Sequence, residues 1–511
     1  MPSNPPFLAV AASQQPAQRT PSSRWIGLAH RVLFAFLALC VILLPHSIKG
    51  ARHAWMIAFW IWLATLLLER RRMFAQPLAL PMLAFIALSG LSTAFSPDPY
   101  LSWADMKLVC YIALVGTLFA QNLTRLSQVR TLVFLLVLSA AAAAGFTAWQ
   151  YTFGIGVRIA HIDWHTPLYR AGIHTNDVIV RVNGKPVHTP DQLRKALDEA
   201  SPGSLLRINL LRGVPTQRRS LIVPIAVGGV GAQSLQMARA TPLRAQGTLG
   251  HYGIFAEVLM PIGCLAWALF LGSLPQRRWS AVIFAVIFLA LTATIFATQS
   301  RAAMIGLLAG CVLAPLLLAP RRRRLWAIVI LLLLAVAANL WIHHSRGLGW
   351  IGGSDAGTRY RQLMWEDGLR LALQHPLVGV GMGTVQNHWQ QWNIRAFAHY
   401  HVYWNFHSDI VQIAAERGFL TLAAWLWFVV AYLVYLLRLL ARARRQNRFA
   451  TVVVAGILSG FVAFLVPSLV ESALNDDALV TLLFFCFGVA VAVDRILQTP
   501  GALDVDWRAA P

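Results

Sequence analysis

Charge is scarce in this chain, and negative charge is scarcer still. Only 12% of its 511 residues are charged, and 20 Asp and Glu stand against 43 Lys and Arg. Hydrophobic residues make up 57% of the chain, and the mean hydropathy is +0.59. About a quarter of the residues of an ordinary soluble domain are charged. The composition therefore excludes an ordinary soluble protein and indicates one that is embedded in a membrane.

Cysteines are few, and the Cys and His motifs that commonly bind zinc are absent from the sequence. The five cysteines all fall within apolar runs and form no Cys-x-x-Cys pair, so neither a disulfide framework nor a zinc site is expected. None of the fifteen histidines is followed by Glu, which excludes the His-Glu-x-x-His motif of a zinc protease. We therefore expect no metal site. The cysteines are Cys40, Cys110, Cys264, Cys311 and Cys486.

Long apolar runs recur along the chain and are long enough to cross a bilayer. Each has about 17 to 25 residues or more, the length needed for a hydrocarbon core of about 30 Å. The pattern predicts an all-α polytopic membrane protein of about twelve transmembrane helices, with a small α/β insertion. The runs lie near 29–45, 53–69, 78–94, 106–121, 131–151, 250–272, 280–297, 302–319, 325–342, 409–437, 450–470 and 478–494.

Arginines in the loops predict the orientation. Clusters at 70–72, 321–324 and 438–448 fall in alternate loops, which places those loops and both termini in the cytoplasm. The first outer loop departs from this trend with Lys49 and Arg52. Because the arginines lie between apolar spans rather than on a folded basic face, no nucleic-acid partner is expected.

The first polar insertion, residues 154–240, has the pattern of a small α/β domain. Val178–Val182 alternates like a strand and ends in the turn Asn183-Gly184, and Pro190–Ala200 has helical spacing. Residues 204–211 and 221–227 are two further expected strands.

The same insertion resembles a bacterial PDZ domain. The resemblance rests on Gly154–Val157, Ala171–Ile173, Asp177–Ile179 and Val182–Gly184. PDZ domains add a partner's terminal strand to a sheet edge. By resemblance, Gly154 and Gly156 would hold the carboxylate of a peptide C-terminus. The alternative is a domain that has lost peptide binding and only shapes the external vestibule.

The second polar insertion, residues 343–407, combines a helix with a glycine-rich turn. Asp355–Leu373 has an apolar row at every fourth residue and ends near His375-Pro376. Gly379–Gly383 contains three glycines and is interpreted as a tight, flexible turn. No preceding strand supports a nucleotide-binding loop there.

Three arginines could bind an anionic group at the external face. Arg301 lies between two predicted spans, where a charge is costly unless it pairs, binds an anion or reaches the interface. Arg361 and Arg359 lie on the polar helix, and guanidinium groups match phosphate oxygens well. The alternatives are snorkelling for Arg301 and a solvated, salt-bridged helix face for Arg359.

A histidine precedes the long apolar run at 409–437. Imidazole can take up a proton near neutral pH, so His407 is a candidate general base. His399 and His401 lie close by, and spacing does not choose among the three. His251 and Glu257, near the start of another span, are second-line candidates for substrate binding.

These pieces together resemble the superfamily of O-antigen ligases and polymerases. The matching segments are Ser300–Ala302, Arg361–Trp365, His375–Gly381 and His407–Gly418, all within about 291–435. The resemblance implies a multi-pass glycosyltransferase of the bacterial inner membrane. Its donor would be a glycan on undecaprenyl diphosphate, and its acceptor a hydroxyl, in ligases one of the lipid A core.

The resemblance also implies residue roles and a mechanism. Arg301 and Arg361 would hold the diphosphate and His407 would act as base. By their own chemistry and position, Arg359, His401, Glu257 and His251 are further candidates for substrate binding. By the resemblance, transfer would be metal-independent and inverting and would need no nucleotide cofactor. The alternatives are an O-antigen polymerase, a protein O-oligosaccharyltransferase, or a transporter or PDZ-bearing scaffold without enzymatic activity.

The sequence thus predicts seven parts. They are a disordered cytoplasmic N-terminus (1–28), transmembrane helices 1–5 (29–151), a periplasmic PDZ-like domain (154–240), transmembrane helices 6–9 (247–342), a periplasmic catalytic loop (343–407), transmembrane helices 10–12 (408–495) and a cytoplasmic tail (496–511).

Overall fold

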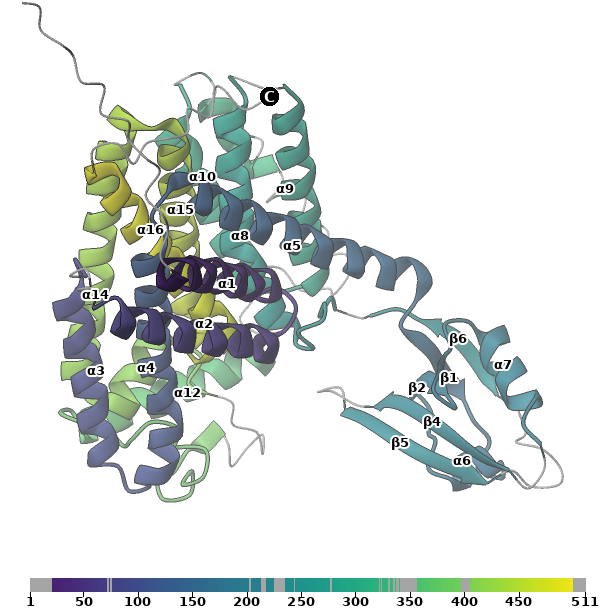
Figure 1. Cartoon of the computed structure of the whole chain (residues 1–511). Helices are drawn as coiled ribbons and strands as arrows, with labels where there is room; N and C mark the ends of the chain where they lie inside the picture. The colour runs from purple at the N-terminus through teal and green to yellow at the C-terminus, as the bar shows by residue number, and fades with distance from the viewer. Residues whose placement is uncertain are drawn as a thin grey trace, which may run out of the picture.

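The computed structural model contains a helical bundle and, beside it, a small domain of strands (Figure 1). The two are joined where helix α5 ends and where the chain leaves the last strand. The structure describes residues 21–499 except 71–72, 74–75, 202–203, 213–216, 225–234, 243, 276–277, 321, 323, 330, 334–335, 337–339, 341–355 and 397–404.

Ten described helices are long and apolar enough to span a membrane. The predicted run at 78–94 forms a helix of only 16 residues, α3, and the run at 325–342 lies partly outside the described residues. The chain is a polytopic, mainly helical membrane protein, as its composition predicts. The bundle helices are α1 (Pro21–Leu43), α2 (Ile48–Leu68), α3 (Ala79–Ala94), α4 (Pro99–Asn122), α5 (Leu126–Phe153), α8 (Tyr252–Ser273), α9 (Arg278–Thr298), α10 (Arg301–Leu318), α14 (Asp409–Gln446), α15 (Arg448–Ser468) and α16 (Asp477–Gln498).

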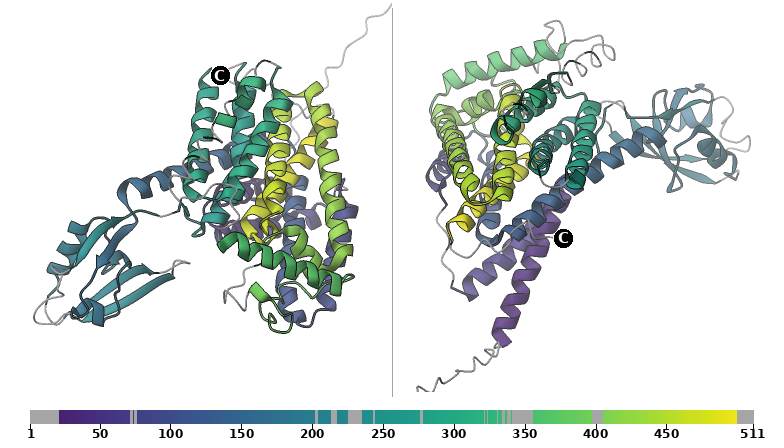
Figure 2. Two further views of the ribbon diagram at one scale, coloured as in Figure 1. Left: turned by 180° about the vertical axis from the view of Figure 1, so that it is seen from behind. Right: turned by 90° about the horizontal axis from the view of Figure 1, so that it is seen from above.

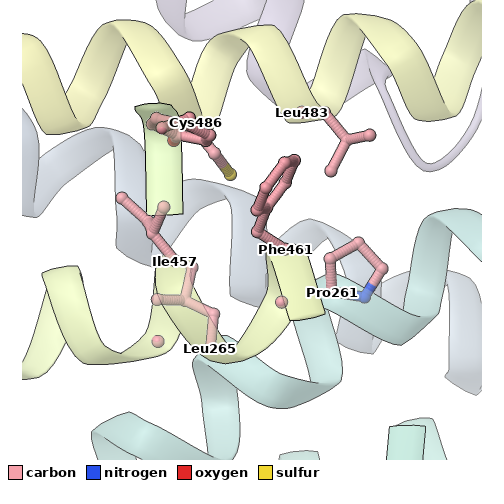
Figure 3. Close-up of a pocket in the computed structure, with 9 residues that line it drawn as sticks. Pro261, Leu265, Ile457, Phe461, Leu483 and Cys486 are labelled. Carbon is pink, nitrogen blue, oxygen red and sulfur yellow. The ribbon is translucent and has the colours of Figure 1, made fainter. Parts of the chain in front are cut away.

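Small residues let the central helices α8, α10 and α15 approach closely. A Cβ on Gly310 of α10 would lie 2.5 Å from both the Cys264 sulfur and the Ser459 carbonyl oxygen. Such small-residue contacts are typical of helix packing in membranes, where backbones must come close for dispersion forces to act. The adjoining small pocket, shown in Figure 3, lies among α8, α14, α15 and α16. Its lining carries no charged side chain, so it is not the candidate site.

One further helix belongs to the second polar insertion. Helix α12 (Ala356–Gln374) runs across the direction of the long helix α14 (Figures 1 and 2). It packs against α14. Helix α14 is broken near its N-terminal end by Gly418, whose φ of 81° interrupts the helical backbone.

The strand domain is a six-stranded antiparallel sheet with two short helices. The sheet has the order β5-β4-β2-β1-β6, with β3 paired to β2. The predicted strand Val178–Val182 is β2, and positive φ angles at Asn183 and Gly184 confirm the turn after it. The elements are β1 (Gly156–His161), α6 (Pro167–Arg170), β2 (Val178–Val182), β3 (Lys185–Pro186), α7 (Pro190–Asp198), β4 (Leu205–Arg212), β5 (Gln217–Pro224) and β6 (Gln236–Ala240).

The sequence predicts the buried face of helix α7 but not the strand β6. Leu193 and Leu197 of α7 are buried against the sheet, as their helical spacing predicts. Strand β6 was not predicted, because its five residues include exposed and polar side chains. It pairs with β1, so the strand that opens the domain lies inside the sheet.

Candidate functional site

The candidate site lies where α12 meets the start of α14. Ser408 caps α14, its hydroxyl accepting from the amide of Val411. His407 therefore stands immediately before the helix, with a φ of 49° that few non-glycine residues adopt. The indole of Trp365 on α12 donates to the His407 carbonyl oxygen at 2.9 Å, and the Tyr360 ring meets the imidazole edge-on. Helix α12 thus fixes the position of this histidine.

A glutamate joins the histidine to the arginine that the sequence singles out. One carboxylate oxygen of Glu471 lies 3.0 Å from Nδ1 of His407, and the other accepts from the guanidinium of Arg361. The three side chains are 17%, 21% and 30% exposed for His407, Glu471 and Arg361, so the group is partly shielded yet open to a ligand. The structure therefore brings together two of the three predicted catalytic residues.

Glu471 was not identified as a site residue from the sequence. It belongs to a short acidic loop after α15, and its only sequence signal is the negative charge between two apolar spans. It lies 64 residues from His407 and 110 from Arg361 along the chain. No local pattern connects positions so far apart.

The acidic loop is docked on the start of α14 by further hydrogen bonds. The Ser408 amide donates to the Ser472 hydroxyl at 3.1 Å, and the Leu474 amide donates to the Asp409 carboxylate at 3.0 Å. Leu474 belongs to the short helix η2 (Ala473–Asn475), and Ser472 directly precedes it. These contacts hold Glu471 at a fixed distance from His407.

Two more carboxyl groups lie near this loop. Glu257 of α8 is buried and hydrogen-bonds with the side chain of Asp476. Burial, and then the neighbouring charge of Asp477, raise the pKa of Asp476 to about 7. Two carboxyl groups can share a hydrogen bond only when one of them carries a proton. Glu257 thus lies beside the candidate site, where its negative neighbours include Glu471.

His251 is the cap residue at the start of α8. Its Nδ1 accepts from the Ile254 amide at 3.4 Å, and its ring stacks on Tyr252, over which the Arg244 guanidinium also lies. Desolvation and then the charge of Arg244 lower the pKa of His251, while Glu471 opposes the shift. Part of His251 nevertheless remains exposed to solvent, which suits contact with a ligand better than a core role.

The remaining predicted site residues have no contact with His407, Glu471 or Arg361 among the bonds described above. Arg301 is the first residue of α10 and is half-buried, and Ser300 caps that helix. Arg359 is exposed on α12, two residues before Arg361. His401 and His399 lie outside the described residues.

The glycine run after α12 packs against the break in α14. The amides of Val380 and Gly381 donate to the carbonyls of Ala415 and Glu416, at 3.0 and 2.9 Å. A Cβ on Gly379 would collide with the backbone of Glu416. The turn predicted here is present, and its glycines permit close contact between two backbones.

The two glycines predicted to receive a peptide lie within the sheet. The amide of Ile155, between Gly154 and Gly156, donates to the Ala240 carbonyl oxygen of β6 at 2.8 Å. Gly156 is paired with Ala240, and a Cβ there would collide with the Ile179 carbonyl oxygen of β2. The glycines thus allow three strands to pack closely, and the amide between them is already bonded.

Comparison with known proteins identifies two domains. Residues 283–426 match the family model of the O-antigen ligase domain, a range that includes His407 and Arg361. Residues 125–223 match the PDZ domain. A stretch of 94 residues, 18% of this chain, is 32% identical to the magnetosome formation protease MamE of Magnetospirillum gryphiswaldense. The stretch covers only 12% of that protein's length. This multi-pass membrane chain therefore carries an O-antigen ligase domain together with a PDZ domain.

Proposed function

We propose that this chain is a glycosyltransferase of the bacterial inner membrane that ligates O-antigen to the lipid A core. The donor would be a glycan on undecaprenyl diphosphate, and the acceptor a sugar hydroxyl. The observation that carries this proposal is the carboxylate of Glu471 between His407 and Arg361, in a chain that matches the O-antigen ligase domain.

His407 is suited to be the general base. With Nδ1 hydrogen-bonded to Glu471, the imidazole is oriented and Nε2 can accept a proton. The acceptor hydroxyl would give its proton to Nε2 while its oxygen bonds to the anomeric carbon of the donor glycan. Glu471 would stabilise the positive charge that the imidazole then carries.

Arg361 is suited to hold the leaving group. As the bond between the anomeric carbon and the diphosphate oxygen breaks, its electron pair passes to the diphosphate. A guanidinium carries five N–H donors, so Arg361 can keep its bond to Glu471 and still donate to phosphate. We assign Arg301 to the same diphosphate and Arg359 to an outer contact. Fixed positive groups favour the charge that develops on the departing oxygen.

The proposed transfer proceeds in one displacement and inverts the anomeric centre. The acceptor oxygen attacks opposite the diphosphate, so no covalent intermediate is formed on the protein. No step is assigned to a metal ion. Glu257 and His251, which lie near Glu471, are proposed to bind substrate hydroxyls. The role of His401 stays a prediction.

The proposal also includes the orientation of the chain in the membrane. The arginine-rich loops would face the cytoplasm with both termini, and the PDZ domain, α12 and the acidic loop would face the periplasm. A lipid-linked donor and the lipid A core would then meet at the outer surface of the membrane. The PDZ domain would recruit a peptide of another protein to this face.

The alternatives differ in acceptor or in class. A polymerase would extend a second glycan chain, and a protein O-oligosaccharyltransferase would use a hydroxyl of a protein. Both keep the same donor and the same site. A transporter or scaffold would use the site for binding alone.

The test is transfer in vitro by the purified full chain, with undecaprenyl-diphosphate-linked glycan, lipid A core and EDTA. The variants are His407→Ala and Arg361→Ala, with matched controls His165→Ala in the PDZ domain and Arg438→Ala towards the far end of α14, both exposed. We expect product from the wild type and the controls and none from the two site variants.

Other outcomes decide between the alternatives. Chain extension, or a glycosylated protein when those acceptors are supplied, would keep the donor chemistry and replace the ligase assignment. No transfer to any acceptor by folded protein would favour a transporter or scaffold. Activity lost in EDTA and restored by a divalent cation would contradict the metal-independent mechanism.

A further inference from the structure

Gln412 is a buried polar side chain near the start of α14, the helix that His407 precedes. Only 4% of the residue is exposed. A buried amide group is costly unless its oxygen and its nitrogen are both hydrogen-bonded. The partners of Gln412 therefore indicate which parts of the fold this side chain connects.

The oxygen of Gln412 is bonded on both sides of the candidate site. Its Oε1 accepts at 2.7 Å from the amide of Phe406, the residue directly before His407. The same atom accepts at 3.5 Å from the hydroxyl of Ser472, the residue directly after Glu471. One atom therefore contacts a neighbour of the candidate base and a neighbour of the carboxylate that bonds to it.

The nitrogen of Gln412 is bonded one helical turn further along α14. The side chains of Gln412 and Glu416 hydrogen-bond with each other, and at a spacing of four residues they lie on the same face of the helix. The Phe406 amide can only donate, so the oxygen of Gln412 must face it and the NH2 group must face Glu416. The Glu416 carboxylate also accepts from the Gly383 amide at 3.2 Å. Gln412 thus connects the segment before α14 with the glycine run after α12.

The backbone of His407 depends on support of this kind. Its φ of 49° lies in the left-handed region, which costs free energy unless the surrounding contacts impose it. The Asn405 side chain accepts from the His407 amide at 2.9 Å, and the side chain of Phe406 is fully buried. With its amide bonded to Gln412, Phe406 is held by its backbone as well as by its ring. The direction in which the imidazole leaves the backbone therefore depends on Gln412.

We propose that Gln412 is a positioning residue of the transfer reaction. It acts through His407 and Glu471, because it fixes a residue next to each of them. This role rests on the transfer function proposed above, but the positioning itself can be measured without a donor or an acceptor.

The variant to test is Gln412→Met, in the full chain in lipid nanodiscs. Methionine is unbranched and similar in size, but it cannot donate to Glu416 and is only a weak acceptor for the Phe406 amide. The control is Thr421→Val, which removes a different buried hydrogen bond of α14, at 2.8 Å from the Thr421 hydroxyl to the Arg417 carbonyl oxygen. Gln412→Glu is the conservative variant, because its new carboxyl group still accepts from the Phe406 amide and can share a proton with Glu416.

Hydrogen exchange measures the positioning directly. In Gln412→Met, the amides of residues 406–408 should exchange at least about tenfold faster than in the wild type, and Thr421→Val and Gln412→Glu should leave them within about threefold. Unchanged exchange of 406–408 in folded Gln412→Met would overturn the proposal, whatever the activity. If Gln412→Met does not fold, Gln412→Asn carries the same expectation, since its amide is one methylene too short to reach both partners.

Kinetics test the connection to transfer. Gln412→Met should lower kcat by about 10- to 100-fold with a similar KM for donor, because a misplaced base slows the reaction without weakening the binding of the substrate. Gln412→Glu should retain most of the wild-type kcat, and so should Thr421→Val. An unchanged kcat in Gln412→Met, or a loss of the same size in Thr421→Val, would overturn the proposal.

A double-mutant cycle separates positioning from a general loss of stability. If Gln412 acts through His407 and Glu471, Gln412→Met should lower kcat by less than about threefold further when Glu471→Gln is already present. The same fold loss in both backgrounds would show that Gln412 only supports the fold, and would overturn the proposal. Faster exchange of 406–408 in Gln412→Met, together with no transfer by the wild type, would refute the transfer function while confirming that Gln412 holds His407.

Discussion

Glu471 accepts a hydrogen bond from His407 at 3.0 Å, although 64 residues separate them along the chain. The same carboxylate pairs with Arg361 of α12. One oxygen of Glu471 thus bonds to the candidate base, His407, and the other bonds to the cationic side chain of Arg361. This arrangement orients the His407 imidazole and places the Arg361 guanidinium close to it.

Glu471→Gln should reduce transfer sharply. An amide cannot stabilise a charged imidazole as a carboxylate does, and the ring loses its fixed orientation. We expect kcat to fall by about 10²–10⁴-fold, the size of a general-base effect. The measurement is the rate at saturating donor and acceptor, followed across pH. The control is Glu366→Gln, which removes a glutamate of α12 that is ion-paired with Arg395. An unchanged rate in Glu471→Gln would contradict the role given to this carboxylate.

Trp365→Phe should impair transfer without unfolding the chain. The variant removes the indole donor that holds the His407 carbonyl oxygen at 2.9 Å but retains an aromatic ring. One lost hydrogen bond costs roughly 1 kcal/mol, so the melting temperature should change little. Because His407 would no longer be held in place, kcat should fall by about tenfold, while the apparent KM for donor stays similar. Trp326→Phe, at an exposed position, is the matched control. A rise in KM with an unchanged kcat would oppose this explanation.

Gly379→Ala should destabilise the fold. The added Cβ would collide with the backbone of Glu416, and the φ of 67° disfavours any residue with a side chain. Overpacking and the strained backbone together should cost about 2–4 kcal/mol. Gly145→Ala in α5 is the matched control, since nothing lies within 4 Å of its added carbon. Thermal unfolding in detergent should show a clear loss for the first variant and no loss for the second. Equal melting temperatures would mean that the glycine run is not a packing element.

Asp476 should make stability depend on pH. Its pKa is raised from 3.8 to about 7 in the fold, so the protonated form is favoured there. The stability linked to this proton is full below pH 3.8 and is lost as the pH rises through about 7. Asp476→Asn, which stays neutral, should therefore lose less stability than the wild type between pH 4 and 8. Asp191→Asn, whose carboxylate is 92% exposed, serves as control. A steeper pH dependence in Asp476→Asn would contradict the sign of this effect.

The class of the protein could be predicted from local sequence alone. Apolar runs of membrane-spanning length specify helices wherever they occur, because every backbone polar group in a bilayer must be bonded within its own segment. The strand and turn around Asn183-Gly184 are equally local, and the structure confirms them. His407 and Arg361 could be singled out by their chemistry and by their position next to apolar spans. Their catalytic roles stay predictions.

The sequence by itself thus determined the membrane helices, the strand domain and the residue types from which a site could be built. Only the tertiary structure decided that Glu471 joins His407 to Arg361, that Gly379 lies against the backbone of Glu416, and that β6 pairs with β1. These contacts link segments far apart in the chain. The periodicity of one segment reports which of its faces is buried, but it carries no information about which distant partner covers that face.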